Sequence, residues 1–251
     1  MSVNPSPQAR ARTVSAAGGA TLFWMQEGQG PRVLLVHGGT GTGAHDWEYV
    51  REPLRRNHRL LICDLRGHGQ SDDPSALLGL RQIGDDTEVL LEAAGGCDAI
   101  VAFSIGATAM LALLARRPDL TRAFVSIAGS VRGDPEQVPR IVSGPWPQEL
   151  IALRHEHATD PEHWRRLRAA MATSWSEHHL SEAELAGIDV PTLVVSGDRD
   201  RVEPLRTALS LFETLPRAEL FVLPGCGHFV PRERPVALAA AVEAFLRRVL
   251  R

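Results

Sequence analysis

Residues 97–107 read CDAIVAFSIGA, and this stretch decides the fold. An apolar run, 99–103, precedes Ser104, and the segment 105–117 that follows is apolar nearly all round. A short apolar run that ends in a turn predicts a buried strand, and the longer apolar segment predicts a buried helix. The pattern therefore places Ser104 at a strand-to-helix turn, with the helix N-terminus directly behind it.

The same pattern, an apolar run followed by a loop, recurs along the chain. Strands are predicted within 32–39, 59–71, 122–130, 191–198 and 218–228, and helices within 44–56, 79–95, 105–117, 202–214 and 233–250. This alternation predicts an α/β fold, a mostly parallel sheet with helices on both faces. The earlier run 20–28 predicts a further strand, for which an antiparallel direction is one option.

From residue 131 to residue 189 the strand rhythm stops, and Pro, Trp, His and charged residues dominate with helical periodicity. Because strands resume at Pro191, we interpret this segment as an insertion and not as a second independent domain. The predicted organisation is a core made of 1–130 and 190–251, with a small helical cap at 131–189.

The composition of the 251 residues excludes several function classes. All 27 positively charged residues are Arg, so neither Schiff-base nor P-loop lysine chemistry is available, and the formal net charge of −3 argues against nucleic acid as a partner. Three cysteines are an odd number without paired spacing, which favours a reducing compartment. The N-terminus has no signal-peptide pattern and no stretch approaches a membrane span. These features predict a soluble, cytoplasmic protein without a membrane partner, and they leave its oligomeric state open.

A tight turn at Ser104 needs small residues two positions before and after it, and these are Ala102 and Gly106. The stretch departs from G-x-S-x-G only in that Ala102 replaces the first glycine. A strained serine costs about 1–3 kcal/mol and is usually met at functional sites. For this stretch taken alone, a structural serine remains the alternative to a nucleophile.

A serine nucleophile needs a base and a group that orients the base. Downstream, GDRD (197–200) and GCGH (225–228) each follow a predicted strand, so Asp200 and His228 belong to the same sheet edge as Ser104. Asp198 is the rival to Asp200 for the acid role. Donors for an oxyanion would come from the glycine-rich loop VHGGTGTG (36–43), and we nominate the backbone N–H groups of Gly39 and Ile105.

In this order, the motifs VHGG, DLRGHGQSD, AFSIGA, GDRD and GCGHF resemble the α/β-hydrolase superfamily, in particular its small cap-bearing esterase, lactonase and haloperoxidase-like members. The resemblance covers roughly 21–130 and 190–250. It implies that Ser104 is the nucleophile, His228 the base and Asp200, in preference to Asp198, the acid. It implies no cofactor.

The function implied is a cofactor-free serine hydrolase that cleaves a small, fairly apolar carboxylic ester or lactone through an acyl-enzyme. Within the family the same triad also serves C–C hydrolases, thioesterases, perhydrolase or haloperoxidase enzymes and lyases. Phe229 follows His228 where C–C hydrolases of this family often have Trp. Outside catalysis, the alternative is a sensor that retains the triad and binds a small molecule under the cap.

Several further residues are assigned structural roles. His37 and His68 lie in glycine-rich turns where imidazoles satisfy backbone groups, and Asp64 and Arg66 are predicted to organise their loop. The histidines of the cap form no metal-ligand pattern, and we predict no metal; they are His155, His157, His163, His178 and His179.

One apolar stripe on a cap helix is formed by Trp164, Leu167, Met171 and Trp175. Its simplest role is to pack the cap on the core, and part of it could also roof a substrate pocket over Ser104. The substrate-binding candidates are Trp146, Trp164, Met171, Trp175 and Phe229. Three arginines of the same helix are predicted to form a solvated face off the stripe; they are Arg165, Arg166 and Arg168.

Overall fold

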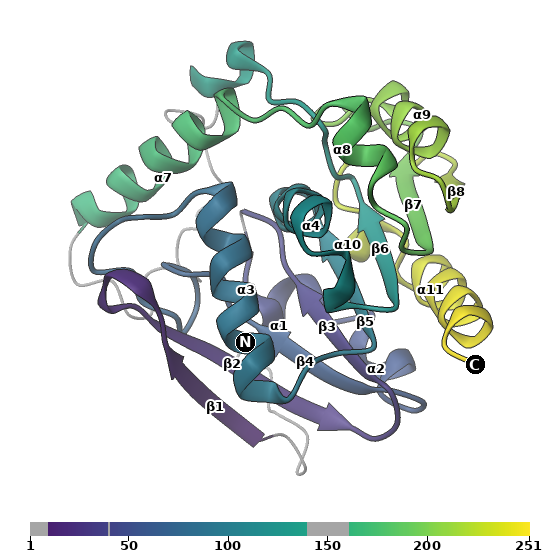
Figure 1. Ribbon diagram of the computed structural model, residues 1–251, viewed down its shortest axis with the longest axis horizontal. Coiled ribbons are helices and arrows are strands. Elements are labelled where there is room, and N and C mark those ends of the chain that lie inside the picture. The colour runs from purple at the N-terminus through teal and green to yellow at the C-terminus, as the bar shows by residue number, and fades with distance from the viewer. Residues whose placement is uncertain (1–9, 40, 140–160) are drawn as a thin grey trace.

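The computed structural model describes residues 10–39, 41–139 and 161–251 of the chain. Its centre is one eight-stranded sheet in the order β1-β2-β4-β3-β5-β6-β7-β8 (Figure 1). Pairing is antiparallel between β1 and β2 and between β2 and β4, and parallel throughout the rest. The strands are β1 (Arg10–Ser15), β2 (Thr21–Gly28), β3 (Arg32–Val36), β4 (Arg59–Cys63), β5 (Ala99–Phe103), β6 (Ala123–Ile127), β7 (Thr192–Gly197) and β8 (Ala218–Leu223).

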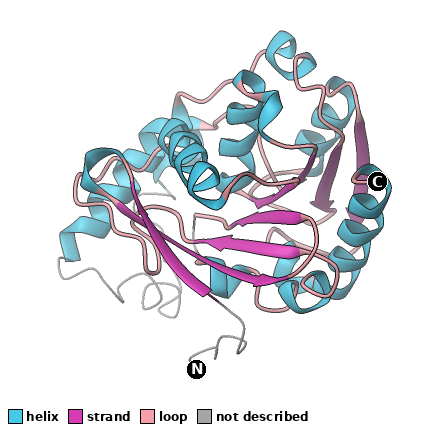
Figure 2. Cartoon of the chain, turned by 60° about the horizontal axis from the view of Figure 1, so that its bottom comes forward, coloured by secondary structure: helices cyan, strands magenta, loops and turns pink. Residues whose placement is uncertain are grey.

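Helices cover both faces of the sheet (Figure 2), which confirms the predicted architecture. Alternate residues of each central strand enter one of two buried cores, as a period of two along a strand requires. The described helices are α1 (Gly43–Asp46), α2 (Arg51–Leu54), α3 (Leu80–Ala94), α4 (Ile105–Arg116), α7 (Pro161–Ser176), α8 (Glu182–Ala186), α9 (Leu205–Thr214), α10 (Val230–Glu233) and α11 (Pro235–Val249). One core contains residues of α3, α4, α8 and α9, and the other contains residues of α2 and α11.

The structure differs from the sequence-based expectation in three elements. The single helix expected over 44–56 is two short helices, α1 and α2, because Glu48 and Val50 between them donate to the carbonyls three residues back, His45 and Trp47, and the α-helical ladder is interrupted there. The helix expected over 233–250 is broken at Arg234, whose φ of −137° fits a residue that precedes proline. The N-terminal strand β1 was not predicted, and its exposed edge position explains its weak apolar pattern.

The two ends of the insertion between β6 and β7 are joined by backbone hydrogen bonds between 131–133 and 178–180, and we call this paired segment the neck. The Gly133 N–H donates to the carbonyl of His178 at 2.9 Å, and the Leu180 N–H donates to that of Val131 at 2.8 Å. Helix α7 lies beyond this neck, away from the sheet (Figure 1). The cap boundaries at 131 and 189 stay a prediction. Residues 140–160, which include Trp146, His155 and His157, lie outside the described part of the chain.

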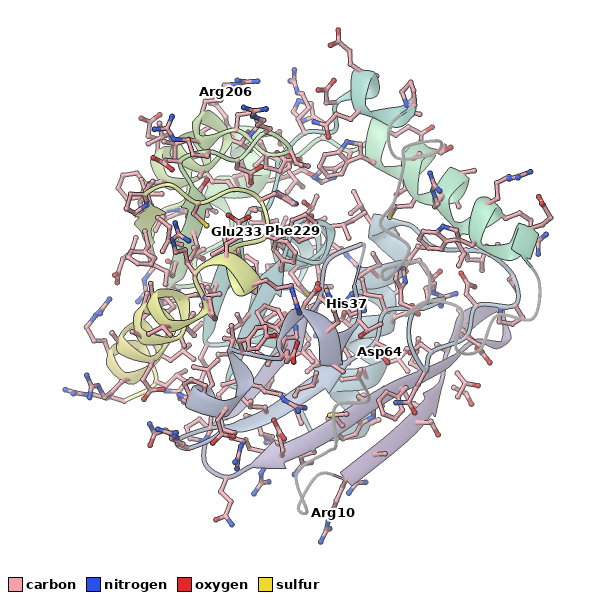
Figure 3. The ribbon with its side chains drawn as sticks, turned by 180° about the vertical axis from the view of Figure 1, so that it is seen from behind. Arg10, His37, Asp64, Arg206, Phe229 and Glu233 are labelled. Atoms are coloured by element: carbon pink, nitrogen blue, oxygen red, sulfur yellow. The ribbon has the colours of Figure 1, made fainter. Side chains whose placement is uncertain are left out.

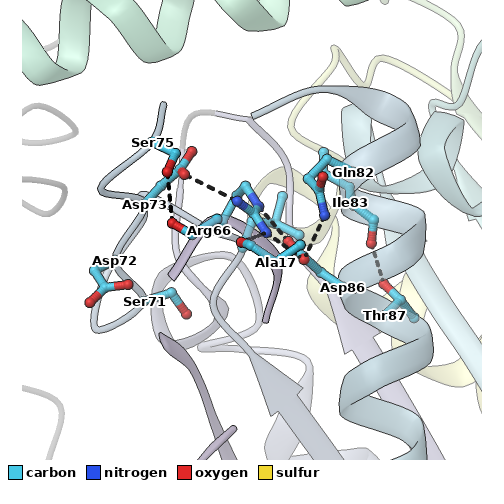
Figure 4. Close-up of polar contacts among 12 residues, drawn as sticks. Ala17, Arg66, Ser71, Asp72, Asp73, Ser75, Gln82, Ile83, Asp86 and Thr87 are labelled. Atoms are coloured by element: carbon cyan, nitrogen blue, oxygen red, sulfur yellow. Dashed lines mark hydrogen bonds and ion pairs between the residues drawn. The ribbon is translucent and has the colours of Figure 1, made fainter. Parts of the chain in front are cut away.

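A buried ion-pair network joins the loop after β4 to helix α3 (Figure 4). The fully buried Arg66 guanidinium donates two hydrogen bonds of 2.6 Å to Asp86, one of 3.1 Å to Asp73, and one of 3.3 Å to the carbonyl of Ala17. A planar guanidinium suits this arrangement because it can bind one carboxylate with two parallel N–H groups. These contacts confirm the predicted loop-organising role of Arg66.

Replacing Arg66 with Met is expected to lower the free energy of unfolding by about 3–5 kcal/mol, because Asp86 and Asp73 would remain buried without their cation. Urea denaturation would measure this loss. The matched control is Arg81→Met, which removes an exposed Arg81–Asp85 pair on α3 and should cost less than about 1 kcal/mol. Equal losses in the two variants would contradict the prediction.

Candidate active site

Ser104 occupies the turn between β5 and α4 in a strained conformation. Its φ of 53° and ψ of −123° lie outside the regions that residues with a side chain commonly adopt, and such strain costs about 1–3 kcal/mol. The turn is tight, since a Cβ at Gly106 would collide with the carbonyl oxygen of His37, and Ala102 is fully buried. The small residues predicted on both sides of Ser104 are therefore required by its surroundings.

The loops after β7 and β8 bring two groups to Ser104. The hydroxyl oxygen of Ser104 lies 2.9 Å from Nε2 of His228, and Nδ1 of His228 lies 2.8 Å from Oδ2 of Asp200. A carboxylate only accepts, so Nδ1 carries the hydrogen and Nε2 is left as the acceptor for the Ser104 hydroxyl. Because β5, β7 and β8 are parallel, their carboxyl ends meet at one edge of the sheet, where ligands bind in such folds.

The two aspartates of the loop after β7 have different surroundings. The Asp200 side chain is fully buried, and its Oδ1 accepts backbone N–H groups of Val202 and Glu203, each at 2.8 Å. The side chain of Asp198 accepts a 3.3 Å hydrogen bond from the backbone N–H of Cys226, and Nε of Arg199 lies 3.7 Å from its Oδ2. The structure brings Asp200, and not Asp198, into contact with His228.

The glycine-rich loop after β3 lies against the nucleophile turn. A Cβ at Gly38 would stand 3.3 Å from the Cβ of Ser104, and one at Gly39 would stand 3.1 Å from the Ile105 side chain. Ile105 is the first residue of α4, where a backbone N–H has no partner within the helix. The predicted oxyanion donors, Gly39 and Ile105, are therefore side by side next to Ser104.

Buried side chains hold this loop in place. Asp46 accepts the Gly38 N–H at 2.9 Å, and Asp64 accepts the Gly43 N–H at 2.8 Å. His37 accepts the Leu65 N–H on Nε2 at 2.8 Å, and its Nδ1 lies 2.6 Å from a backbone carbonyl. The hydrogen bonds confirm that His37 and Asp64 satisfy backbone groups. Sequence reasoning missed Asp46, which lies in a four-residue helix and carries no motif signal.

Helix α7 of the insertion packs directly on these loops. A Cβ at Gly39 would lie 3.2 Å from the sulfur of Met171, and the ring of Trp164 lies 5.8 Å, centroid to centroid, from that of His68. Nε2 of His68 in turn lies 3.3 Å from the carbonyl oxygen of Gly39. The predicted stripe is therefore buried against the core, and two of its members contact the loop next to Ser104 or the histidine bound to it.

The other substrate-binding candidates lie further round the site. Phe229, half-buried, has its ring 5.6 Å from that of His228, and its backbone N–H donates to Glu233 at 3.2 Å. Figure 3 labels Phe229 on the loop after β8 and Glu233 at the end of α10, near His37 and Asp64 on the loops after β3 and β4. Trp175 stacks on His178 at the neck, with centroids 6.4 Å apart. Trp146 lies outside the described residues.

Arg168 departs from its predicted position on the solvated face. Four residues after Trp164 and three before Met171, it falls on the same side of α7 as the stripe, and its guanidinium lies 5.8 Å from the Trp164 ring. Burial lowers the pKa of Arg168. The expectation that it is solvated is wrong, because a spacing of three or four residues returns to one helix face, whereas Arg165 and Arg166 are exposed as expected.

Among the described residues, the cysteines offer no alternative nucleophile and the histidines no metal site. Burial raises the pKa of the Cys63 and Cys97 thiols to about 12 and that of Cys226 to about 11, so none is a thiolate near neutral pH. Within 10–39, 41–139 and 161–251, no cluster of three or more His, Cys, Asp or Glu side chains could hold a metal ion. No helix in the same ranges is long and apolar enough to cross a membrane.

The model of the "Alpha/beta hydrolase family" matches residues 33–241, which is most of the chain. This chain belongs to the alpha/beta hydrolase family. The match spans every strand from β3 to β8 and every candidate site loop, so the predicted fold and superfamily are confirmed.

Individual members of the alpha/beta hydrolase family resemble the chain over nearly its whole length. A 2-hydroxy-6-oxo-6-(2'-aminophenyl)hexa-2,4-dienoic acid hydrolase of Metapseudomonas resinovorans is 27% identical, over 92% of this chain and 89% of its own. A thermophilic esterase of Thermogutta terrifontis has a TM-score of 0.80 at 25% identity, covering 96% of this chain and 99% of its own. An enol-lactonase of Burkholderia xenovorans shares the fold, with a TM-score of 0.81 at 22% identity over 94% of this chain and all of its own.

Proposed function

We propose that this chain is a serine hydrolase that cleaves a small, fairly apolar carboxylic ester or lactone through an acyl-enzyme. The observation that carries the proposal is the continuous hydrogen-bonded chain from Ser104 to His228 to Asp200, which begins at a strained serine. A hydroxyl is a weak nucleophile until a base takes its proton, and this arrangement supplies the base and a carboxylate to orient it.

In the proposed reaction, Ser104 Oγ attacks the ester carbonyl carbon while its proton passes to Nε2 of His228. The carbonyl oxygen becomes an oxyanion, which the N–H groups of Gly39 and Ile105 stabilise at the N-terminus of α4. The imidazolium, held by Asp200, gives its proton to the leaving alcohol as the C–O bond breaks. Water then repeats the sequence on the acyl-enzyme and releases the acid.

The surroundings of Gly39 support an apolar acyl group. Met171 and Ile105 both reach this glycine, and Trp164 packs on the histidine that contacts its carbonyl. An apolar wall with a few polar groups beside the reacting atoms is the usual character of a small-molecule site. We therefore propose Trp164 and Met171 as the residues of α7 that contact the substrate, with Phe229 contributing from the side of His228.

A substrate panel tests the proposal against its alternatives. Short-chain aryl esters, lactones, thioesters and 2-hydroxy-6-oxo-dienoates would be offered to the protein and to Ser104→Ala at equal concentration. We expect kcat/KM for an ester or lactone to exceed that for the other classes by about tenfold or more. Fastest turnover of a thioester would reassign the bond, and slow single turnover with a large ligand-induced rise in Tm would favour the sensor.

A second candidate is hydrolysis of a substrate that carries a carboxylate, including a C–C bond in a 2-hydroxy-6-oxo-dienoate. It is favoured by the dienoic acid named for the Metapseudomonas relative and by Arg168, a partly buried cation on the side of α7 that faces the core. A guanidinium recognises a carboxylate through paired N–H groups. In the panel, this candidate would be supported by turnover of the dienoate in excess of the neutral esters.

A further inference from the structure

The carbonyl of Ser104 is held by two hydrogen bonds from a single residue, Thr108, which the mechanism above does not use. The backbone N–H of Thr108 donates to this carbonyl at 2.9 Å, and the Thr108 hydroxyl donates to it at 3.2 Å. Thr108 lies on α4 and is fully buried. A carbonyl oxygen has two lone pairs, so Thr108 supplies a donor for each of them.

The carbonyl of Ser104 and the N–H of Ile105 belong to one peptide group. A trans peptide group is planar, and its C=O and N–H point in opposite directions. A donor that fixes the Ser104 carbonyl therefore also fixes the direction of the Ile105 N–H, which is the proposed donor to the oxyanion. A hydrogen bond to the carbonyl also polarises the peptide group and makes its N–H a stronger donor.

This peptide group needs support because the backbone of Ser104 is strained. Its φ of 53° and ψ of −123° persist only where the surroundings hold them. At the same φ, the ordinary left-handed conformation has a ψ of about +47°. The backbone would reach it by turning the 104–105 peptide group over, which would direct the Ile105 N–H away from the substrate. The two bonds from Thr108 oppose that rotation.

The direction of the Thr108 hydroxyl is set by Ser130, in the segment that follows β6. The backbone N–H of Ser130 donates to Oγ1 of Thr108 at 3.0 Å, and Ser130 is itself buried. A hydroxyl has one proton, and with a backbone donor on its oxygen this proton is left for the Ser104 carbonyl. The two segments approach closely, since a Cβ at Gly129 would stand 3.0 Å from the Cβ of Ala107.

The second proposed donor, the Gly39 N–H, is supported in the same way. The carbonyl of its peptide group is that of Gly38, and Nδ1 of His37 lies 2.6 Å from it. Nε2 of His37 accepts the Leu65 N–H at 2.8 Å, so the imidazole hydrogen is on Nδ1 and is donated to the Gly38 carbonyl. Behind each proposed donor, a buried side chain accepts a backbone N–H and donates its own hydrogen to the carbonyl of the donor's peptide group.

A threonine in a helix often bonds to the carbonyl four residues back, and such a bond alone indicates no role in a site. Thr87 of α3 forms one with the carbonyl of Ile83 at 2.8 Å and is also buried. What distinguishes Thr108 is the carbonyl that it holds, because the same peptide group carries the Ile105 N–H. Thr87 is therefore a matched control for Thr108.

We propose that Thr108 is a positioning residue of the oxyanion site: its hydroxyl, oriented by Ser130, holds the Ser104–Ile105 peptide group so that the Ile105 N–H faces the carbonyl oxygen of the substrate. The inference rests on the proposed function, because it assigns that N–H to the oxyanion of the ester reaction. The oxyanion exists in the transition state and not in the bound ester. The Thr108 hydroxyl therefore raises kcat and leaves KM nearly unchanged.

Steady-state kinetics on the best ester or lactone of the panel compares Thr108→Val, which keeps the shape of threonine without its hydroxyl, with Thr87→Val. We expect Thr108→Val to lower kcat by about 10- to 100-fold, less than the loss of a whole oxyanion donor, with KM within about twofold of the wild type. Thr87→Val should keep the kcat of the wild type. Equal kcat in the two variants, or a loss in Thr108→Val that appears only in KM, would overturn the proposal.

Two further variants separate the hydroxyl from the packing around it. Thr108→Ser restores the hydroxyl and should recover most of the lost kcat. Thr108→Ala has neither the hydroxyl nor a methyl group against the Ser130 N–H, and its kcat should be as low as that of Thr108→Val. Circular dichroism verifies that each variant is folded. A kcat of Thr108→Ser as low as that of Thr108→Val would contradict a role for the hydroxyl.

Amide NMR spectra test the contact without a substrate and keep this proposal separate from the proposed function. Loss of the hydrogen bond to the Ser104 carbonyl should move the Ile105 amide proton upfield in Thr108→Val, because its N–H is less polarised. Thr87→Val and Thr108→Ser should leave that resonance at its wild-type position. An Ile105 resonance that stays in place in Thr108→Val would overturn the proposal. A wild type that turns over no ester would defeat the proposed function, yet these spectra would still decide whether Thr108 holds the Ile105 N–H.

Discussion

Replacing Ser104 with Ala is expected to reduce ester or lactone turnover by roughly 10⁴-fold or more while leaving the fold intact. The loss should appear in kcat, because the missing oxygen is the atom that forms the acyl-enzyme. The substitution removes the covalent route entirely, whereas the glycine-rich loop can still bind the carbonyl of the substrate. Alanine also keeps the small volume that the turn demands, so a change in Tm of more than a few degrees is not expected.

Fluorophosphonate labelling followed by intact mass measurement checks the same assignment without a natural substrate. The wild type should gain one label per chain, and Ser104→Ala should gain none. The matched control is Ser126→Ala, because Ser126 is a fully buried serine on the neighbouring strand β6 whose hydroxyl has no hydrogen-bond partner among the described residues. Labelling of Ser104→Ala at the wild-type level would move the nucleophile to another residue.

The sheet was predictable because the sequences of buried parallel strands are short apolar runs that end in loops. Strands β3 to β8 all show this pattern. The exceptions have physical causes that the local pattern does not express. β1 is an exposed edge strand, so nothing selects an apolar run there. The helix after β3 is interrupted where Glu48 and Val50 bond to the carbonyls three residues back, and apolar periodicity does not distinguish that short turn from an α-helix.

The site was predictable to the extent that it depends on strand ends. Ser104, Asp200 and His228 could be placed at one edge because each directly follows a parallel strand, although sequence alone left Asp198 as a rival. Asp46 could not be found in this way, since its role is to accept the Gly38 N–H from a four-residue helix that carries no motif. Contacts between segments far apart in the chain decide such roles, and no spacing encodes them.

Replacing Asp200 with Asn is expected to lower kcat by about 10⁴-fold, while Asp198→Asn should lower it by less than about tenfold. In Asp200→Asn, the backbone N–H groups of Val202 and Glu203 would retain the amide oxygen at the position of Oδ1. The amide NH₂ would then face Nδ1 of His228, which must become the acceptor. The imidazole hydrogen would move to Nε2, where it blocks acceptance of the Ser104 proton.

The same reasoning makes Asp198→Asn a matched control. Asp198 accepts the backbone N–H of Cys226 at 3.3 Å, a bond that an amide oxygen can keep, whereas the carboxylate that contacts Nδ1 of His228 is that of Asp200. Steady-state kinetics on one ester would compare the two variants, with circular dichroism to verify that both are folded. If Asp198→Asn lost more activity than Asp200→Asn, the acid would be Asp198, and the 2.8 Å contact between Asp200 and His228 would have a structural meaning only.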